Sequence, residues 1–453
     1  MIAPARVAAY HILSSVSAGR ADLPSAIAQA RASLHDDRDR ALASEIATGV
    51  QRWRAALDQL IESMSKRTID RLDPEIVEIL RLSIYQLLHL TRVPAAAVVD
   101  DAVDLTRRVG KRSASGFVNA VLRSVSRKRS SLPLPGRPAN TADRAAALAY
   151  FAITLSHPAW LAARWYDRFG FDVTERWLRF NNAPAPLTLR ANRLVIAPGE
   201  LRSALAKEDV SVEPGSFAPD ALIVSAGNPL RGSHSAQGWF VVQDEASQLI
   251  TLLAGEHPGP RVLDTCASPG GKTTAVAAVL AEGGRVVACD VRDRRIELLR
   301  RTVRAARATR HVDIVQADVR LPLPFRARFD CVIVDAPCSG LGTLRRDPDI
   351  RWRRQEADLP ALAASELQML QQAAGQVAAG GRLVYATCSS EPEENEAVVD
   401  AFLHSAPDFV HVDARTAHPL LAPALVDARG DLRTSPDRHG LEAFFGAVFQ
   451  RQA

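Results

Sequence analysis

The sequence predicts a multidomain protein with an all-α helical bundle, a small α+β module and an α/β domain built on a doubly wound, mostly parallel sheet. Three observations support this prediction. Helical periodicity runs through residues 6–125, a segment rich in Pro, Gly, Ser and Arg follows at 130–138, and short apolar strands alternate with helices from residue 243 onward. We therefore expect the three parts to span residues 1–130, 131–242 and 243–453.

The helical bundle is predicted from apolar residues that recur at spacings of three and four. The clearest series is Ile76, Ile79, Leu80, Ile84 and Leu87, and the Asp-Pro pair at 73–74 is typical of a helix start. After the predicted linker, short apolar runs at 187–190 and 221–224 indicate strands of a small α+β module.

The last part of the chain contains short β-branched runs separated by helical stretches. We expect strands over 261–264, 285–290, 312–315, 331–334 and 381–385. Strands that alternate with helices form parallel, doubly wound sheets, and such sheets bind ligands beyond the carboxyl ends of their strands. The residues that follow these strands are therefore candidates for a functional site.

Composition excludes several classes of protein. No apolar stretch reaches the ~18 residues that a membrane span needs, and Met1–Arg6 lacks the pattern of a secretion signal, so we expect a cytoplasmic protein without a membrane partner. Five cysteines without a Cys-x-x-Cys pair argue against a disulfide framework and a structural zinc site, and we expect no metal.

The net charge of +5 is mild evidence for a polyanionic partner. We expect Arg345, Arg346 and Arg351 to contact the phosphates of such a partner.

A glycine loop follows the first strand of the α/β part, in the run Asp264-Thr265-Cys266-Ala267-Ser268-Pro269-Gly270-Gly271-Lys272-Thr273. A phosphate-binding P-loop would need glycine where Cys266 stands, so a nucleoside triphosphate is excluded. The second strand ends in Asp290, where an acid usually holds a ribose, and Asp318 follows the third. The glycine loop and these acids indicate an adenosine-bearing cofactor.

Two cysteines follow strands directly, in Asp335-Ala336-Pro337-Cys338-Ser339 and Thr387-Cys388-Ser389. A cysteine after an apolar run is usually a core residue, and we interpret Cys289 and Cys331 in that way. Cys338 and Cys388 stand at predicted strand exits, each before a small serine, and we interpret both as catalytic.

At this point the residues resemble a known family, the S-adenosylmethionine-dependent RNA cytosine-5 methyltransferases, and most closely its bacterial RsmB (Sun) type, which acts on 16S ribosomal RNA. The matching motifs are Cys266-Ala267-Ser268-Pro269-Gly270-Gly271-Lys272, Asp290, Asp318, Asp335-Ala336-Pro337-Cys338, Arg345-Arg346-Asp347-Pro348-Asp349-Ile350-Arg351-Trp352 and Thr387-Cys388. The resemblance implies a Rossmann-like class I methyltransferase domain, a NusB-like RNA-binding bundle at 1–130, an RNA-binding module at 131–242 and 16S ribosomal RNA as the partner.

The resemblance also implies roles for the site residues. S-adenosylmethionine would be bound by residues 266–272 together with Asp290, Asp318 and Asp335. Cys388 would be the nucleophile, Cys338 would assist product release, and Asp335 and Lys272 would act beside them. The second cysteine matters here, because DNA cytosine-5 methyltransferases use the Pro-Cys cysteine as their nucleophile and have no Thr-Cys partner. Two alternatives remain open: an enzyme of the same chemistry that acts on transfer RNA, and a non-catalytic RNA-binding factor of the NusB kind.

Overall fold

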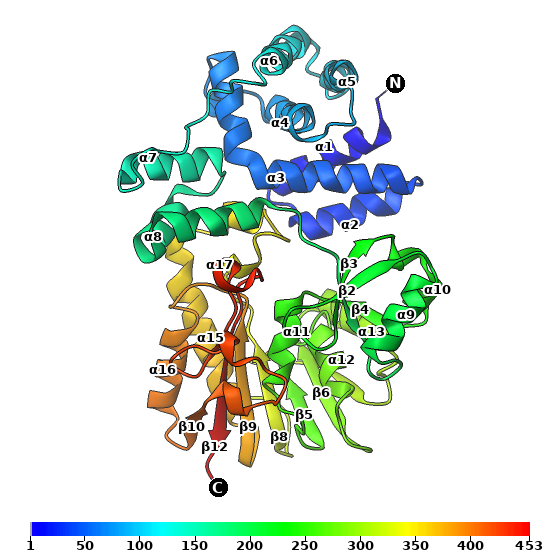
Figure 1. Ribbon diagram of the computed structural model, residues 1–453, viewed down its shortest axis with the longest axis vertical. Coiled ribbons are helices and arrows are strands. Elements are labelled where there is room, and N and C mark those ends of the chain that lie inside the picture. Colours follow the sequence, from blue (N-terminus) through cyan, green and yellow to red (C-terminus); the bar gives the residue numbers. More distant parts are fainter. Residues whose placement is uncertain (1) are drawn as a thin grey trace. The chain divides into compact units, whose positions relative to one another are not determined.

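The computed structural model describes residues 2–453, which form two compact units (Figure 1). The helical unit comprises Met1–Pro184 together with Leu344–Glu356, and the sheet unit comprises Ala185–Thr343 together with Ala357–Ala453. The chain therefore leaves the sheet unit shortly after Cys338 and returns to it thirteen residues later.

The first unit consists of helices, of which those before residue 128 pack around a shared apolar core. Their bounds are α1 Pro4–Ser17, α2 Leu23–Ser33, α3 Asp37–Ser65, α4 Pro74–His89, α5 Ala95–Arg108, α6 Ser115–Arg127, α7 Arg144–Ala149, α8 Ala159–Asn182 and α14 Ile350–Arg353, with a π-helix at Tyr150–Thr154 and 3-10 turns at Ile69–Arg71 and Arg112–Ala114. As predicted, α4 starts directly after Asp73, with proline in its first turn, and buries Ile76, Ile79 and Leu80. The predicted helical bundle is confirmed.

The segment Leu344–Glu356 is held inside the helical unit by Arg351, whose side chain is completely buried. Its guanidinium donates to Asn182 Oδ1 at 2.9 Å and to the carbonyl oxygen of Ser156 at 3.1 Å. The prediction that Arg351 contacts RNA phosphates is therefore wrong. Its charge serves protein acceptors, which the sequence alone does not reveal.

The small module of the sheet unit is a four-stranded antiparallel sheet with the order β2-β3-β1-β4. Its elements are β1 Thr188–Ala191, α9 Pro198–Ala206, β2 Ser211–Pro214, β3 Ala221–Ala226, α10 Ser233–Ala236 and β4 Phe240–Val242, with a 3-10 turn at Pro229–Arg231. Leu201 and Leu205 of α9 pack with Leu189 and Leu222 of the strands, and all four side chains are buried. The predicted strands at 187–190 and 221–224 match β1 and β3 to within two residues.

The large sheet has eight strands, and its main path has the order β10-β12-β9-β8-β5-β6-β7. The strands are β5 Arg261–Asp264, β6 Arg285–Asp290, β7 Val312–Gln316, β8 Phe329–Asp335, β9 Val377–Thr387, β10 Phe409–Val412, β11 Leu432–Arg433 and β12 Phe445–Arg451. Strands β5 to β9 pair in parallel, whereas β10, β11 and β12 are antiparallel additions. Strand order reverses between β5 and β8, and this switch point is where doubly wound sheets bind ligands.

Helices cover both faces of the large sheet. Helices α11 Glu245–Leu252, α12 Gly271–Ala277 and α13 Asp293–Ala305 pack on one face, and α15 Leu359–Ala374 and α16 Glu396–Ser405 pack on the other. Short elements near the chain end include α17 Pro436–His439 and 3-10 turns at Ala414–Thr416 and Pro423–Leu425. Cys289 and Cys331 lie inside β6 and β8 with no exposed surface, so their interpretation as core residues is confirmed. Among residues 2–453, no helix combines the length and the apolar composition that crossing a bilayer requires.

Candidate active site

Two cysteine thiols meet beyond the carboxyl ends of β8 and β9. These strands are parallel neighbours, and Asp335 pairs with Ala386 in their register. The loops that follow therefore leave the sheet side by side, which brings Cys338 Sγ within 3.3 Å of Cys388 Sγ. Both cysteines are half-buried residues. The structure thus brings together two residues that are fifty positions apart in the sequence.

One of the two thiols, that of Cys338, has a raised pKa. The hydrogen bond with Cys388 and the burial of its own sulfur hold the pKa of Cys338 well above the ordinary value for a cysteine. Cys338 therefore stays protonated at neutral pH and can donate its proton in a hydrogen bond to the sulfur of Cys388. The thiolate is the nucleophilic form of cysteine, and Cys338 is not in that form at neutral pH.

Lys272 and Asp335 form an ion pair next to the cysteines, with Nζ 2.6 Å from Oδ2. The ammonium group also lies 5.5 Å from the centre of the Phe444 ring. Burial alone would lower the pKa of Lys272, but the charge and the hydrogen bond of Asp335 raise it above its ordinary value. The lysine therefore keeps its positive charge at neutral pH.

The glycine loop connects β5 to α12 and is fixed from several directions. Gly270 has a φ of +108°, and a Cβ atom added to it would lie 2.9 Å from Leu299 Cδ1. Only glycine takes this conformation without strain. The Ala267 N–H donates to the carbonyl oxygen of Cys289 at 2.8 Å, and the Ser268 N–H donates to Asp290 Oδ2 at 3.2 Å.

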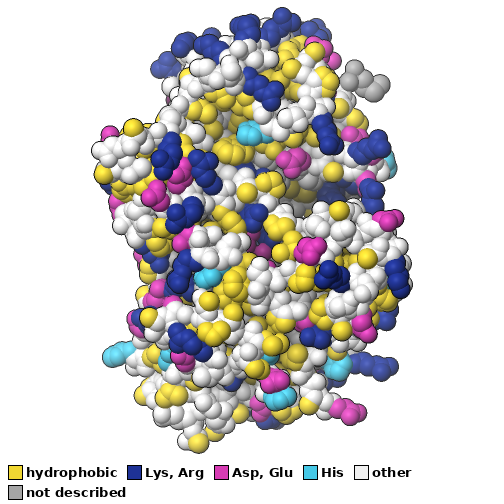
Figure 2. Space-filling model, viewed as in Figure 1, with side chains coloured by type: hydrophobic (Ala, Val, Ile, Leu, Met, Phe, Trp, Pro, Cys, Tyr) yellow, Lys and Arg dark blue, Asp and Glu magenta, His cyan; other side chains and the backbone are white. Residues whose placement is uncertain are grey.

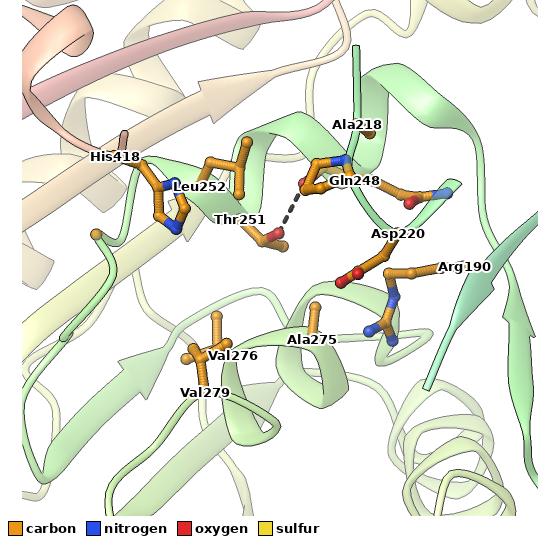
Figure 3. A pocket seen from close by; sticks show the side chains of 12 residues that line it. Arg190, Ala218, Asp220, Gln248, Thr251, Leu252, Ala275, Val276, Val279 and His418 are labelled. Carbon is orange, nitrogen blue, oxygen red and sulfur yellow. Dashed lines mark hydrogen bonds between the residues drawn. The ribbon is translucent and has the colours of Figure 1, made fainter. Parts of the chain in front are cut away.

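Arg190 of β1 supports this loop from behind. Its guanidinium is buried and donates to the Gly271 carbonyl oxygen at 3.2 Å, to Thr274 Oγ1 at 2.9 Å and to Gln243 Oε1 at 2.7 Å. Figure 3 shows Arg190 at one wall of a small cavity, with the carboxylate of Asp220 nearby. The cavity has a volume of about 50 Å³, and the hydrogen bonds of Arg190 at its wall hold the glycine loop.

Two of the predicted acids lie at the carboxyl ends of β6 and β7. Asp290 ends β6, and its Oδ1 accepts the Val291 N–H at 2.8 Å. No other described residue donates to that oxygen, so it retains acceptor capacity for a ligand hydroxyl. Asp318 follows β7 and pairs with Arg320 at 2.6 Å, and the hydrogen bonds from Arg320 lower its pKa.

Asp264 is a further acid that the sequence analysis did not single out. It ends β5, and burial raises its pKa to about 7. Its Oδ2 accepts a hydrogen bond from Thr273, whereas its buried Oδ1 has no hydrogen-bond partner among the described residues. An unpaired buried oxygen is costly unless a ligand satisfies it. Together with the acceptor capacity of Asp290, this oxygen fits a polar cofactor bound along the loop.

Two serines and a glutamate were also missed by the sequence analysis. Ser339 and Ser389 directly follow the two cysteines, and both hydroxyl groups donate to Glu394. Glu394 lies in the run Glu391-Pro392-Glu393-Glu394-Asn395-Glu396, which has the composition of a solvated surface segment but buries Glu394 completely. The serine after each cysteine was the available signal. Within residues 2–453, no group of three His, Cys, Asp or Glu side chains is arranged to hold a metal ion.

Comparisons with known proteins identify the family. Residues 250–450 match the family model described as 16S rRNA methyltransferase RsmB/F, and residues 3–127 match the NusB family. Residues 157–231 match the ferredoxin-like domain of RsmF/B-like methyltransferases. The chain is 32% identical over 414 residues to "Probable ribosomal RNA small subunit methyltransferase B" of Bacillus subtilis, and the match covers 90% of each chain. The chain belongs to the RsmB/F family of RNA methyltransferases.

Other relatives agree with this family. "Ribosomal RNA small subunit methyltransferase B" of Pseudomonas putida is 33% identical over 421 residues, which cover 92% of this chain and 93% of the relative. Among solved structures, the crystal structure of PH0851 is 25% identical with a TM-score of 0.81, covering 100% of this chain and 99% of the other. The RsmB/F resemblance, the NusB domain and the methyltransferase fold expected from the motifs are therefore confirmed.

Proposed function

We propose that this RsmB/F-family protein transfers the methyl group of S-adenosylmethionine to carbon 5 of a cytosine in 16S ribosomal RNA through a covalent adduct with Cys388. The observation that carries the proposal is the thiol pair at 3.3 Å beside the Lys272–Asp335 ion pair. The family description and the names of the relatives, which specify 16S or small-subunit ribosomal RNA, support the target.

The first step answers a chemical difficulty. Carbon 5 of cytosine is a poor nucleophile, and a thiolate that adds to carbon 6 makes it an enamine carbon. In this step the Cys388 sulfur forms a bond to carbon 6, and the electron pair of the 5,6 double bond moves onto carbon 5 and the ring. The Cys388 thiol gives up its proton as it adds, ring nitrogen 3 becomes more basic and takes up a proton, and Asp335 would accept a hydrogen bond from the protonated nitrogen. Lys272 holds Asp335 in position through their ion pair.

The cofactor would be held by residues 266–272 together with Asp264, Asp290 and Asp318. Oδ1 of Asp290 would accept hydrogen bonds from the ribose hydroxyl groups. The unpaired Oδ1 of Asp264 would accept a hydrogen bond from another donor of the bound molecule. S-adenosylmethionine supplies an electrophilic methyl group. The chain contributes the orientation that brings carbon 5 of the adduct towards that methyl group, and such positioning can supply a large part of the rate enhancement.

Product release requires cleavage of the bond between the Cys388 sulfur and carbon 6. A base takes the proton from carbon 5, the 5,6 double bond forms again, and the electron pair of the carbon–sulfur bond returns to Cys388. The Cys338 thiol, 3.3 Å away, stabilises the departing thiolate with a hydrogen bond. The two cysteines therefore have different roles: Cys388 forms the carbon–sulfur bond, and Cys338 helps to break it.

The helical unit offers a surface for the RNA backbone. Figure 2 shows Lys and Arg side chains gathered along the top edge of the view, over α5 and α6. The exposed basic residues of this region, called here the α5–α6 basic surface, are Arg107, Arg108, Arg112, Arg123, Arg127, Lys128 and Arg129. Clustered cations of this kind bind phosphates by releasing counterions.

Mapping of methylated cytosines tests the proposal. We expect bisulfite sequencing of 16S ribosomal RNA to show a cytosine that resists conversion in wild-type cells and becomes convertible when the gene is deleted. Purified protein with S-adenosylmethionine should restore the resistance on RNA from the deletion strain. A deletion that changes only transfer RNA, or a methyl group on a nitrogen atom of the base, would contradict the proposal.

A further inference from the structure

Glu394 ties together the two loops that carry the cysteines. Its side chain has no exposed surface and lies between β9 and α16. Oε1 accepts the Ser339 backbone N–H at 2.6 Å, and Oε2 accepts the Ser339 hydroxyl at 2.6 Å and the Ser389 hydroxyl. Each serine directly follows one of the two cysteines in the sequence. A single carboxylate is therefore hydrogen-bonded to both of the residues that follow the cysteines.

Glu394 is itself held in place. The Tyr385 hydroxyl of β9 donates to the Glu394 carbonyl oxygen at 2.6 Å and lies 3.1 Å from Glu366 Oε2. Asn395, the next residue, accepts a hydrogen bond from Thr387 and donates to the Ser389 carbonyl oxygen at 3.0 Å. The backbone at Glu394 and Asn395 is therefore anchored to the strand that ends in the Cys388 loop.

The hydrogen bonds of Glu394 hold the two cysteine loops together. Burying a carboxylate removes its hydration, and only well-placed donors compensate for that loss. Glu394 receives donors from both cysteine loops, and no lysine or arginine of residues 2–453 is ion-paired with it. The buried carboxyl of Glu366 lies beside it, and burial together with Glu394 raises the pKa of Glu366 to about 9. If either loop moved away, the buried charge would lose donors. The cost of that loss opposes separation of the loops.

We propose that Glu394 is a positioning residue that keeps the Cys338 and Cys388 thiols in register for adduct formation and release. It does not touch the base or the cofactor and acts only through Ser339 and Ser389. The inference rests on the proposed function of the two cysteines, but the thiol spacing that it explains can be measured without any methyl transfer.

The test combines kinetics with a chemical probe of the thiol pair in the full-length protein. Phenylarsine oxide bridges two neighbouring thiols through one arsenic atom and releases one water molecule. In Glu394→Gln, neutral hydrogen bonds replace charge-assisted ones, which are roughly twice as strong. We expect kcat for ribosomal RNA to fall about 100-fold, as for ~1 Å misplacement of reacting groups, with KM unchanged. Arsenical affinity should fall about tenfold, because the second thiol is presented at lower effective concentration.

Ser389→Ala removes one hydrogen bond to Glu394 without changing the buried charge, and it serves as the second variant if Glu394→Gln folds poorly. Its effect on kcat should not add fully to that of Glu394→Gln, because Ser389→Ala removes a hydrogen bond that Glu394→Gln already weakens. Glu282→Gln, at an exposed glutamate of the sheet unit, is the matched control and should retain wild-type kcat and arsenical affinity. Wild-type kcat and arsenical affinity in both Glu394→Gln and Ser389→Ala would overturn the proposal. If the protein methylated no cytosine at carbon 5, the arsenical measurement would still decide the role of Glu394.

Discussion

Gly342 connects the two cysteine loops through its backbone, and replacing it by alanine should disturb the site without touching a reactive group. Its N–H donates to the Cys388 carbonyl oxygen at 2.9 Å, and its carbonyl oxygen accepts the Ala443 N–H at 3.0 Å. A Cβ atom added to Gly342 would lie 1.9 Å from the Ala443 oxygen and 2.7 Å from the Cys388 oxygen. Both clashes are with backbone atoms, which cannot rotate away.

The size of the effect follows from these distances. Ordinary contact begins at 3.4 Å, so the backbone around Gly342 must shift by about 1.5 Å relative to Ala443. Misplacement of reacting groups by ~1 Å can cost about 100-fold in rate. We therefore expect kcat/KM of Gly342→Ala to fall about 100-fold. Affinity for S-adenosylmethionine should stay close to that of the wild type, because the glycine loop lies on another strand.

The assay is transfer of a labelled methyl group from S-adenosylmethionine to unmodified ribosomal RNA. Gly375→Ala is the matched control, because the nearest atom to its added Cβ, the Gln372 oxygen, lies at an ordinary 3.4 Å. Thermal unfolding of both variants excludes a folding defect as the cause. A Gly342→Ala enzyme with wild-type kcat/KM would refute the claim that close approach of these loops supports catalysis.

Three further changes test separate parts of the account. Asp290→Ala should weaken S-adenosylmethionine binding about 10- to 100-fold by calorimetry, because charge-assisted hydrogen bonds contribute ~1.5–3 kcal/mol; unchanged affinity would place the ribose elsewhere. Arg351→Met should destabilise the helical unit by about 3 kcal/mol in denaturant unfolding, because buried acceptors lose their donor, whereas the exposed control Arg112→Met should stay within about 0.5 kcal/mol. His411 donates to the buried Asp431, which raises its pKa, so its contribution to stability is complete below its unfolded pKa of about 6.5 and is lost as pH rises through the higher folded value. Wild-type stability relative to His411→Asn should therefore decline above about pH 6.5, and a constant difference would contradict this.

Local patterns predicted the strands and the edge of the sheet where the site lies. The strands predicted at 261–264 and 285–290 coincide with β5 and β6, because each β-branched run ends at an aspartate followed by a loop. Parallel pairing then requires that residues after these strands meet at one edge, and the structure places Cys338 beside Cys388 accordingly. The sequence contained this information because strands and their exits are local features.

Other features depend on contacts between distant residues. Arg351 has the same charge as the exposed Arg353 two residues later, and only the fold shows that Ser156 and Asn182 receive its hydrogen bonds. Glu394 stands in an acidic run that resembles a surface segment, yet Ser339 and Ser389 draw it into the interior. Burial of a charge is determined by its distant partners, so composition alone cannot predict it.

The most direct test of the central claim asks which cysteine forms the bond to RNA. Each variant is incubated with unmodified ribosomal RNA and S-adenosylmethionine and then run on a denaturing gel. Cys338→Ala should attack and methylate but release product slowly, so a covalent protein–RNA complex should accumulate. Cys388→Ala should be inactive and should form no complex. A complex that forms with Cys388→Ala but not with Cys338→Ala would make Cys338 the nucleophile and contradict the account.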